Sequence, residues 1–405
     1  MKEIYTAQRL DEVHSDIRGP LFYKALEMQK NGIEVLKLNT GNPAAFGFTM
    51  PDSILSALQN EIPKGLGYCD FRGMPEAREA IAAYHRGKGI ADATADDVFI
   101  GNGISEVASF AMQALLNPGD EVLMPTPCYS LWSNCVRLTG AKPRFYLCDE
   151  ASEWNPDCAD IRKKITDKTR AIIIINPNNP TGALYSDEIL MEIANIAREH
   201  NLLIFSDEIY DRLVMDGAKH TSIAALAPDL PIITMNGLSK SHCLCGFRTG
   251  WMLISGPRAL TESYRQGIVK LTSMRLCSNA LAQIVIPAAI ADDETPTSMI
   301  SKGGRIYEQR EATIRALDNI PGISYVKNKA ALYLFPKLDV ARFNITNDKK
   351  FAGDLLEATN ILIVPGSGFE WEKPDHFRIV MLPRPEKLKE AMERMGNFLD
   401  GYKQN

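Results

Sequence analysis

The string IITMNGLSKSHCLCGFRTGW, residues 232–251, places one lysine, Lys240, shortly after a run of apolar residues. Near-continuous apolar runs are typical of strands that are buried on both faces of a sheet. The residues after the lysine include Arg248 and a second apolar run at 251–254. A lysine amine that is desolvated or lies near other cations loses its proton and attacks carbonyl groups. A lysine after a strand is usually a solvated charge, but Lys240 lies downstream of NPNNPTG (176–182) and SDEIYD (206–211), and this combination makes it a candidate for a Schiff-base lysine.

Short apolar runs alternate with helical periods on both sides of this string. We predict strands at 98–100, 121–124, 143–147, 171–175, 202–206, 232–235 and 251–254, and helices at 104–116 and 187–200. Ser186 is expected to cap the second helix, with two acidic residues in its first turn. This alternation predicts an α/β fold in which helices flank a mainly parallel central sheet.

The pattern changes after about residue 290. Longer charged helical stretches occur at 305–317 and 385–402, and shorter strands are predicted at 331–335, 361–364 and 377–381. These features predict a smaller α+β domain. The polar, proline-containing stretch 292–298 is consistent with a boundary, although a long helix could also connect the two parts. A chain of 405 residues favours two domains. We predict a large domain at 46–290, and a second unit that combines the N-terminal arm 1–45 with residues 291–405.

The composition is that of an ordinary globular protein, with 45% apolar and 23% charged residues. The net charge of −5 argues against nucleic acid and against an anionic membrane as partners. No apolar stretch approaches the ~20 residues that span a bilayer, and the first residues lack the form of a signal peptide. We therefore expect a cytoplasmic protein.

The cysteine pattern predicts free thiols rather than disulfide bonds or metal ligands. The eight cysteines are scattered along the chain, and we expect them to be free. The cluster of His242, Cys243 and Cys245 has no second ligand pair at zinc-site spacing, so no metal site is predicted.

Polar or glycine-rich segments follow several predicted strands, which is where open α/β sheets bind ligands. The turn GNGIS (101–105) precedes a helix whose free N–H groups could bind an anion, although an ordinary strand-to-helix turn would use the same glycines. Tyr129 could stack on a flat cofactor or pack in the core. The loop NPNNPTG (176–182) offers asparagine amides to a phenolate or carboxylate, but its composition also suits a simple turn.

Two charged residues lie in or beside apolar strands. Asp207 follows the run 202–206, and a buried carboxylate needs a charged partner. A protonated pyridine nitrogen would serve, and its ring would then act as an electron sink; helix capping is the alternative. Arg378 lies inside the strand 377–381 and invites a carboxylate in bidentate geometry, or an internal ion pair.

The order of these motifs resembles that of the class I (fold type I) aminotransferases, which depend on pyridoxal 5'-phosphate (PLP). The resemblance covers nearly the whole chain. It rests on NNPTG, on the Asp-x-x-Tyr at Asp207, on Ser239-Lys240, and on Arg248 eight residues after the lysine. Within the class, the strings DIRGP, TGNPAAFGF, GYCDFRG, NPNNPTG and MRLCSN are most similar to bacterial glutamate–pyruvate (alanine) transaminases.

The resemblance implies a role for each matching residue. Lys240 would form the Schiff base and move the α-proton, Asp207 would pair with the pyridine N–H, and Tyr210 with Asn179 would hydrogen-bond the ring oxygen. The full cofactor set implied is Gly103, Ile104, Ser105, Tyr129, Asn179, Asp207, Tyr210, Ser239, Lys240 and Arg248, with Tyr68 reaching a neighbour's phosphate across a homodimer interface. Gly41, Asn179 and Arg378 would bind the substrate carboxylate.

A dicarboxylate substrate would need a second basic residue, and Arg18 and Arg275 are both open for that role, with a structural ion pair as the alternative for each. The chain also departs from the family pattern. Gly237 stands where many relatives have a serine, and the residues after the lysine are rich in thiols. We hypothesise that Cys243 or Cys245 lies near the cofactor and makes activity sensitive to oxidants.

The reaction implied by the resemblance is amino transfer from L-alanine to 2-oxoglutarate, giving pyruvate and L-glutamate by a ping-pong mechanism. The substrates are thus an amino acid and a 2-oxo acid. A related transaminase with aromatic, branched or aspartate-type specificity stays open, and so does a C–S lyase on the same scaffold. A PLP-fold transcription regulator would carry an added basic domain, which the ~20 residues before this region and the negative charge argue against.

Overall fold

An eight-stranded sheet forms the centre of the computed structural model, which describes residues 3–405. The strand order is β2-β9-β8-β7-β6-β3-β4-β5. The strands are β2 (Val98–Asn102), β3 (Glu121–Thr126), β4 (Lys142–Asp149), β5 (Asn155–Pro156), β6 (Thr169–Ile175), β7 (Leu203–Asp207), β8 (Ile232–Gly237) and β9 (Thr249–Ser255). Strands β8, β7, β6, β3 and β4 run parallel, whereas β9 is antiparallel to both of its neighbours and β5 is antiparallel to β4. The prediction of a mainly parallel sheet is confirmed.

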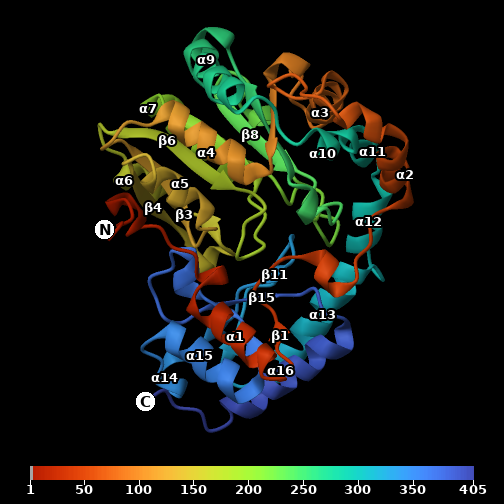
Figure 1. Cartoon of the computed structure of the whole chain (residues 1–405). Helices are drawn as coiled ribbons and strands as arrows, with labels where there is room; N and C mark the ends of the chain where they lie inside the picture. Colours follow the sequence, from red (N-terminus) through yellow and green to blue (C-terminus); the bar gives the residue numbers. More distant parts are fainter. Residues whose placement is uncertain (1–2) are drawn as a thin grey trace.

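Helices cover both faces of this sheet (Figure 1). The helices of this part are α2 (Asp52–Glu61), α3 (Pro75–Gly87), α4 (Ile104–Leu115), α5 (Leu131–Arg137), α6 (Cys158–Lys164), α7 (Asp187–His200), α8 (Ile223–Leu226), α9 (Arg258–Arg275), α10 (Ala280–Ile284), α11 (Ile286–Ala291) and α12 (Glu294–Ile300). In β6, Ile172 and Ile174 join the core that contains α7, while Ile173 and Ile175 join the core that contains α4. The apolar run is continuous because each face of the strand is buried against a helix.

The two helices predicted in detail are confirmed. Helix α7 has the predicted bounds, and the Ser186 side chain accepts a hydrogen bond from the backbone N–H of Ile189 at 3.4 Å. Helix α4 begins at Ile104, directly after Gly103, whose φ of +81° is a backbone conformation that glycine adopts without strain. The chain therefore turns sharply from β2 into α4, so that the first N–H groups of the helix end at the edge of the sheet.

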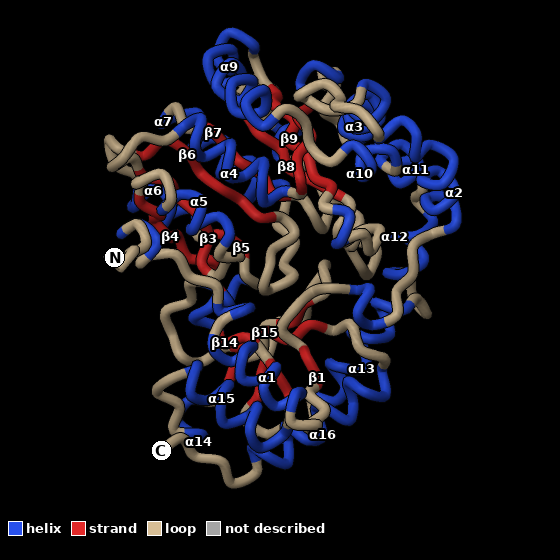
Figure 2. Tube along the Cα trace, viewed as in Figure 1, coloured by secondary structure: helices blue, strands red, loops and turns tan. Residues whose placement is uncertain are grey.

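A smaller assembly of short strands and helices lies below the large sheet (Figure 2). Its strands are β1 (Leu36–Lys37), β10 (Ile323–Ser324), β11 (Tyr333–Leu334), β12 (Lys337–Leu338), β13 (Ile361–Leu362), β14 (Val364–Pro365) and β15 (Phe377–Val380). Its helices are α1 (Pro20–Lys30), α13 (Arg305–Leu317), α14 (Val340–Phe343), α15 (Asp348–Thr359) and α16 (Pro385–Leu399). The N-terminal and C-terminal segments lie together here, since β1 pairs in parallel with β13. The predicted division at 46–290 is not tested by these contacts and stays a prediction.

Three details of this part differ from the sequence expectations. The single strand predicted at 361–364 is wrong: β13 pairs with β1, whereas β14 pairs with β15, because Ile363 separates two different partners. The last helix ends at Leu399 rather than 402. The stretch 292–298 is not an irregular break, because α12 runs through most of it and holds Pro296 in its first turn, where proline is tolerated.

The eight cysteines are free, as expected. Within residues 3–405, none of the helices combines the length and apolar character needed to cross a membrane.

Candidate active site

Lys240 lies at the carboxyl end of the large sheet, in the loop after β8. Its Nζ donates to the backbone oxygen of Gly41 at 2.7 Å and lies 3.9 Å from the sulfur of Cys245. Burial lowers the pKa of the Lys240 ammonium, but Tyr333, Cys245 and Tyr129 together outweigh burial and leave the pKa raised. The amine is thus held among acidic hydroxyl and thiol groups rather than exposed to solvent.

Asp207 ends the neighbouring strand β7 and is buried, as the sequence predicted. One carboxylate oxygen accepts a hydrogen bond from the indole N–H of Trp132 at 3.0 Å, and the other accepts from the backbone N–H of Ile209 at 3.3 Å. Burial raises the pKa of Asp207 to about 6, while Trp132, Ile209 and Lys240 act in the opposite direction. A cation placed beside this carboxylate would relieve the cost of burying it.

A pair of buried tyrosines lies on the other side of the lysine. The hydroxyl oxygens of Tyr210 and Tyr333 are 2.8 Å apart, and their rings meet edge to face with centroids at 5.6 Å. A Cβ on Gly41 would overlap the Tyr333 hydroxyl and would lie 3.2 Å from two of its ring carbons. Glycine at position 41 therefore allows the Tyr333 ring to approach the backbone that binds Lys240.

Arg378, in β15, is almost fully buried and holds the opposite wall of the site. Its guanidinium donates to the side-chain oxygen of Asn179 at 3.0 Å and to the backbone oxygen of Asn39. Its Nε is buried without a hydrogen-bond partner in the described part of the chain. A buried guanidinium with a free donor is suited to bind a carboxylate. Arg378 and Asn179, both predicted to bind the substrate carboxylate, are thus in direct contact, and their role stays a prediction.

An anion cradle lies at the N-terminus of α4. A Cβ on Gly103 would overlap the guanidinium of Arg248, and the Arg248 Nη1 donates to the backbone oxygen of Cys245 at 2.9 Å. Ile104 and Ser105 supply the first turn of a twelve-residue helix, whose N–H groups and dipole favour negative charge. Backbone amides, a helix dipole and an arginine thus converge on one point.

Gly237, where the sequence departs from the family pattern, has a local structural cause. A Cβ there would lie 2.6 Å from the backbone oxygen of Thr249 and 3.1 Å from Gly250 on the paired strand β9. A serine at this position would need β8 and β9 to separate.

The remaining predicted residues lie at the surface or at the rim. Tyr129 and Ser239 are half-buried, and Tyr129 is close enough to Lys240 and Arg378 for both to influence its pKa, which burial raises. Tyr68 is 84% exposed. Arg275 is occupied by an ion pair with Glu106 and by the backbone oxygens of two neighbours, so its structural alternative is the one observed. The Arg18 side chain is exposed and has no hydrogen-bond or ion-pair partner within residues 3–405.

The three thiol and imidazole groups that follow the lysine point to different partners. His242 bonds to Ser241 and to the backbone oxygen of Asp292 at 3.0 Å each, and Cys243 contacts the sulfur of Met299. Cys245 donates to the backbone oxygen of Ser239 at 2.9 Å. Of the two cysteines proposed to lie near the reacting centre, Cys245 is therefore the one beside Lys240.

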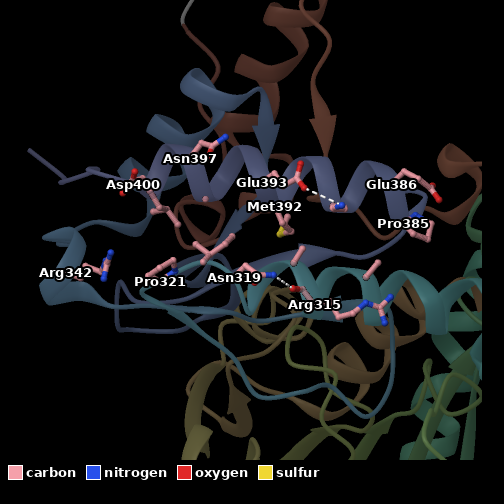
Figure 3. Close-up of a pocket in the computed structure, with 16 residues that line it drawn as sticks. Arg315, Asn319, Pro321, Arg342, Pro385, Glu386, Met392, Glu393, Asn397 and Asp400 are labelled. Atoms are coloured by element: carbon pink, nitrogen blue, oxygen red, sulfur yellow. Dashed lines mark hydrogen bonds and ion pairs between the residues drawn. The ribbon is translucent and has the colours of Figure 1, made fainter.

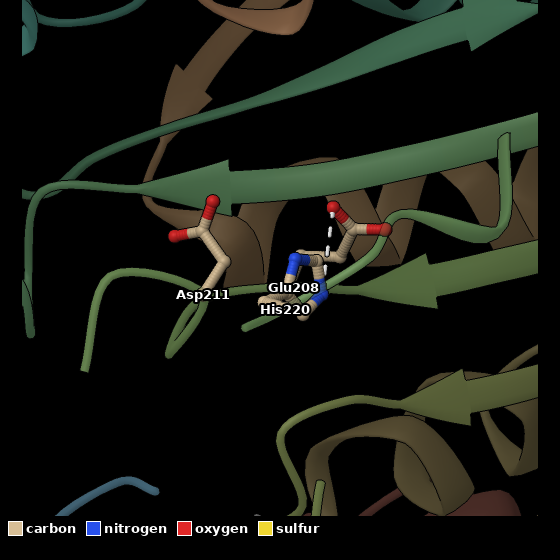
Figure 4. Close-up of side chains that lie close together, drawn as sticks. All are labelled: Glu208, Asp211 and His220. Carbon is tan, nitrogen blue, oxygen red and sulfur yellow. Dashed lines mark ion pairs between the residues drawn. The ribbon is translucent and has the colours of Figure 1, made fainter. Parts of the chain in front are cut away.

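A separate buried polar cluster lies behind Asp207 and consists of Glu208, Asp211 and His220, with ligand-type atoms within 4.8 Å of one another (Figure 4). Glu208 accepts hydrogen bonds from the hydroxyls of Ser206 and Ser222, and burial raises its pKa to about 8. The ammonium of Lys88 lies 3.3 Å from Asp211. A cation already occupies the acidic side of this cluster, so the cluster is a buried ionic network beneath the sheet end.

A groove of about 990 Å³ lies away from this site. It lies between α13 and α16 and is lined by residues such as Arg315, Asn319, Met392 and Glu393 (Figure 3). None of the residues around Lys240 lines it. Side chains of both charge signs line it, so its lining shows no excess of either sign.

Sequence reasoning missed three residues of the site: Trp132, Tyr333 and Asn39. Trp132 lies within the short helix α5, which was not among the predicted helices, and Tyr333 lies in the strand predicted at 331–335 for the second domain. Both are buried and carry one polar atom that must find a partner, which is the signal that marks a tyrosine or tryptophan near a polar site. Asn39 contributes its backbone oxygen, which no side-chain pattern reports.

Comparisons with known proteins identify the family of the chain. The profile of the family "Aminotransferase class I and II" matches residues 33–395. The chain is 50% identical over 404 residues to glutamate-pyruvate aminotransferase AlaA of Escherichia coli, covering 100% of each chain. It is 45% identical over 397 residues to the alanine aminotransferase of Mycobacterium tuberculosis, covering 98% of this chain and 92% of that one. The crystal structure of an aminotransferase from E. coli superposes with a TM-score of 0.98 at 50% identity, with 100% of each chain covered.

Proposed function

The chain belongs to the class I and II aminotransferase family, and on this premise we propose that it transfers an amino group between L-alanine and 2-oxoglutarate, forming pyruvate and L-glutamate. The observation that carries the proposal is the convergence of the Lys240 amine, the buried Asp207 carboxylate and the buried Arg378 guanidinium at one sheet end. Identity to a glutamate-pyruvate aminotransferase along the full length supports the choice of substrates.

We infer that the cofactor is pyridoxal 5'-phosphate, because its charged groups match the donor set of the site. A phosphate fits the N-terminus of α4 together with Arg248 and Ser239. Gly103 has no side chain, so the guanidinium of Arg248 can lie close to the backbone where the phosphate would bind. The carboxylate of Asp207 fits a protonated ring nitrogen, and the Tyr129 ring can lie against a flat ring. When bound, this cofactor supplies an electron sink for the charge left at an α-carbon that loses its proton.

Each remaining role in binding and proton transfer is assigned to a residue of the chain. The Lys240 amine would hold the cofactor and would carry a proton to and from the substrate α-carbon. Asp207 would keep a proton on the ring nitrogen, and Tyr210 with Asn179 would donate to the ring oxygen. Arg378, with its free Nε, binds the substrate α-carboxylate and orients the α-proton toward the lysine.

For the second carboxylate of 2-oxoglutarate we propose Arg18. Arg275 is paired with Glu106, whereas the Arg18 guanidinium is exposed. Its segment is tied to the site, because the side chain of Asn39 donates to the backbone oxygen of Ile17 at 2.8 Å while the backbone of Asn39 accepts from Arg378.

We also propose a cytoplasmic homodimer with a composite site. Tyr68 is 84% exposed, and Leu66, two residues earlier in the chain, is 86% exposed. Apolar side chains that are exposed side by side can form part of an interaction surface. Sedimentation equilibrium of the purified protein tests this proposal, and a monomer at micromolar concentration would contradict it.

Steady-state kinetics with a panel of amino donors and 2-oxoglutarate test the reaction. L-Alanine should give the highest kcat/KM, with parallel double-reciprocal lines, and the visible absorbance band of the loaded enzyme should change when alanine is added without 2-oxoglutarate. The Lys240→Ala variant should show neither response. Faster turnover of an aromatic, branched or acidic donor would contradict L-alanine as the substrate. Elimination of a thiol from a cysteine conjugate would contradict amino transfer as the main reaction.

A further inference from the structure

Tyr333 is a buried residue to which the roles above assign nothing. It belongs to β11 in the smaller assembly, where its register partner on β15 is Val380, two residues from Arg378. The guanidinium of Arg378 lies over its ring at 4.5 Å from the centroid. This distance is within the range in which a cation is attracted to the face of an aromatic ring. The position of Tyr333 is thus tied to that of Arg378.

The other end of the same side chain reaches the residues around the cofactor site. The Tyr333 hydroxyl is 2.8 Å from that of Tyr210, which follows β7 in the large sheet. It also lies against Gly41, whose backbone oxygen accepts from Lys240. A single side chain therefore touches the carboxylate-binding arginine, a ring-oxygen donor and the backbone that holds the lysine.

The donors and acceptors of the two tyrosine hydroxyls set which of them donates in the Tyr210–Tyr333 hydrogen bond. A tyrosine hydroxyl has one proton to donate and lone pairs that accept. In the proposed function Tyr210 donates its proton to the cofactor ring oxygen, so the Tyr210 oxygen must accept the proton of Tyr333. A hydroxyl that accepts a hydrogen bond becomes a better donor in its own bond. Tyr333 would then strengthen the bond that stabilises the anionic ring oxygen.

We propose that Tyr333 is a positioning residue that couples carboxylate binding at Arg378 to the protonation of the cofactor–lysine linkage through Tyr210. The inference rests on the proposed function, since it assumes that the cofactor binds beside Tyr210. A carboxylate on Arg378 pulls the guanidinium from the Tyr333 ring, which shifts the hydroxyl pair and changes the proton affinity of the linkage before chemistry begins.

The test is a pH titration of the visible absorbance of the cofactor-loaded enzyme, with and without propionate, which has the carboxylate of alanine but no amine. In the wild type, propionate should shift the midpoint. In Tyr333→Phe the midpoint without propionate should rise by about 0.4–1 pH unit, the equivalent of one hydrogen bond, and the propionate shift should fall by more than half. Tyr325→Phe is the control, because the Tyr325 hydroxyl bonds to the surface residue Asp318.

A second variant tests the same idea while the Tyr333 side chain is kept. Gly41→Ala displaces the Tyr333 hydroxyl without removing it and should move the midpoint in the same direction. A midpoint within 0.1 unit of wild type in both variants, or an undiminished propionate shift, overturns the proposal. Absence of a visible band from the wild-type enzyme supplied with cofactor would instead contradict the proposed function, so the two failures are distinguishable.

Discussion

Replacing Trp132 with phenylalanine removes one hydrogen bond from Asp207 and leaves a small unfilled space in the core, because Trp132 is fully buried. The indole N–H is the side-chain donor to that carboxylate, at 3.0 Å, and Trp132 packs against Phe205 with ring centroids 6.2 Å apart. Phenylalanine keeps a ring in this position but has no donor. Asp207 is left with the backbone N–H of Ile209 at 3.3 Å.

The expected cost follows from the charge on the acceptor. A hydrogen bond to a charged group contributes about 1.5–3 kcal/mol, which corresponds to about 10–150-fold in a binding constant. Burial raises the pKa of Asp207 to about 6 and Trp132 opposes that rise, so its removal raises the pKa further. More of the carboxyl is then neutral near pH 7, and a neutral carboxyl does not pair with a protonated ring nitrogen. The cofactor Kd should increase, and the pH below which affinity falls should move upward.

The assay is titration of the apoenzyme with pyridoxal 5'-phosphate between about pH 5.5 and 8, followed by visible absorbance. Trp371→Phe is a matched control, because Trp371 is also buried and its indole donates to Asp375 at 2.8 Å, away from the site. Both variants should lose stability, but only Trp132→Phe should lose affinity. A Kd within twofold of wild type, or an equal loss in the control, would refute this reasoning.

Three further predictions concern charge and thiol chemistry. Burial raises the pKa of Glu208 to about 8 in the folded state, so the folded protein retains a proton that the unfolded chain loses, and the stability from this group is lost as pH rises from about 4.5 to 8. In denaturant titrations at several pH values, Glu208→Gln should lose less stability than the wild type over that window, by on the order of a few kcal/mol. Parallel curves of stability against pH for the two proteins would contradict this expectation. Iodoacetamide should inactivate the wild type and Cys243→Ser but not Cys245→Ser, since only Cys245 lies beside Lys240; equal inactivation rates in all three would exclude Cys245. Arg18→Ala should raise KM for 2-oxoglutarate by about 10-fold or more while KM for pyruvate changes little, and unchanged selectivity in the reverse and forward half-reactions would reject Arg18.

Much of the large sheet could be predicted because each buried strand is marked by a local run of apolar residues in the sequence. The run 171–175 is apolar at every position, and only a strand covered on both faces buries such a run. Helix α7 carries its own capping residue, Ser186, so its start was readable locally. The short strands of the smaller part were less predictable, because β13 exists only through its pairing with β1, more than 300 residues earlier in the chain.

The same distinction holds within the site. Lys240, Asp207 and Arg248 stand at motif spacings, so the residues themselves indicated the chemistry. Trp132 and Tyr333 have no such spacing, and their roles depend on which polar atom each meets after folding. The choice between Arg18 and Arg275 depended on Glu106, a residue of α4 whose proximity to Arg275 follows from the packing of α4 on α9.

The sequence alone determined the α/β class, the order of the chemical groups and the choice of Lys240 as the candidate reactive lysine, because strand burial and motif spacing are local properties of the chain. The tertiary structure decided which groups surround that lysine. Gly41 and Arg378 approach it from segments that lie far apart in the sequence, and Gly237 is small because Thr249 of the paired strand leaves no room. These contacts arise when segments far apart in the sequence, or neighbouring strands of one sheet, are brought together by folding, and no local pattern specifies the distance at which their atoms meet.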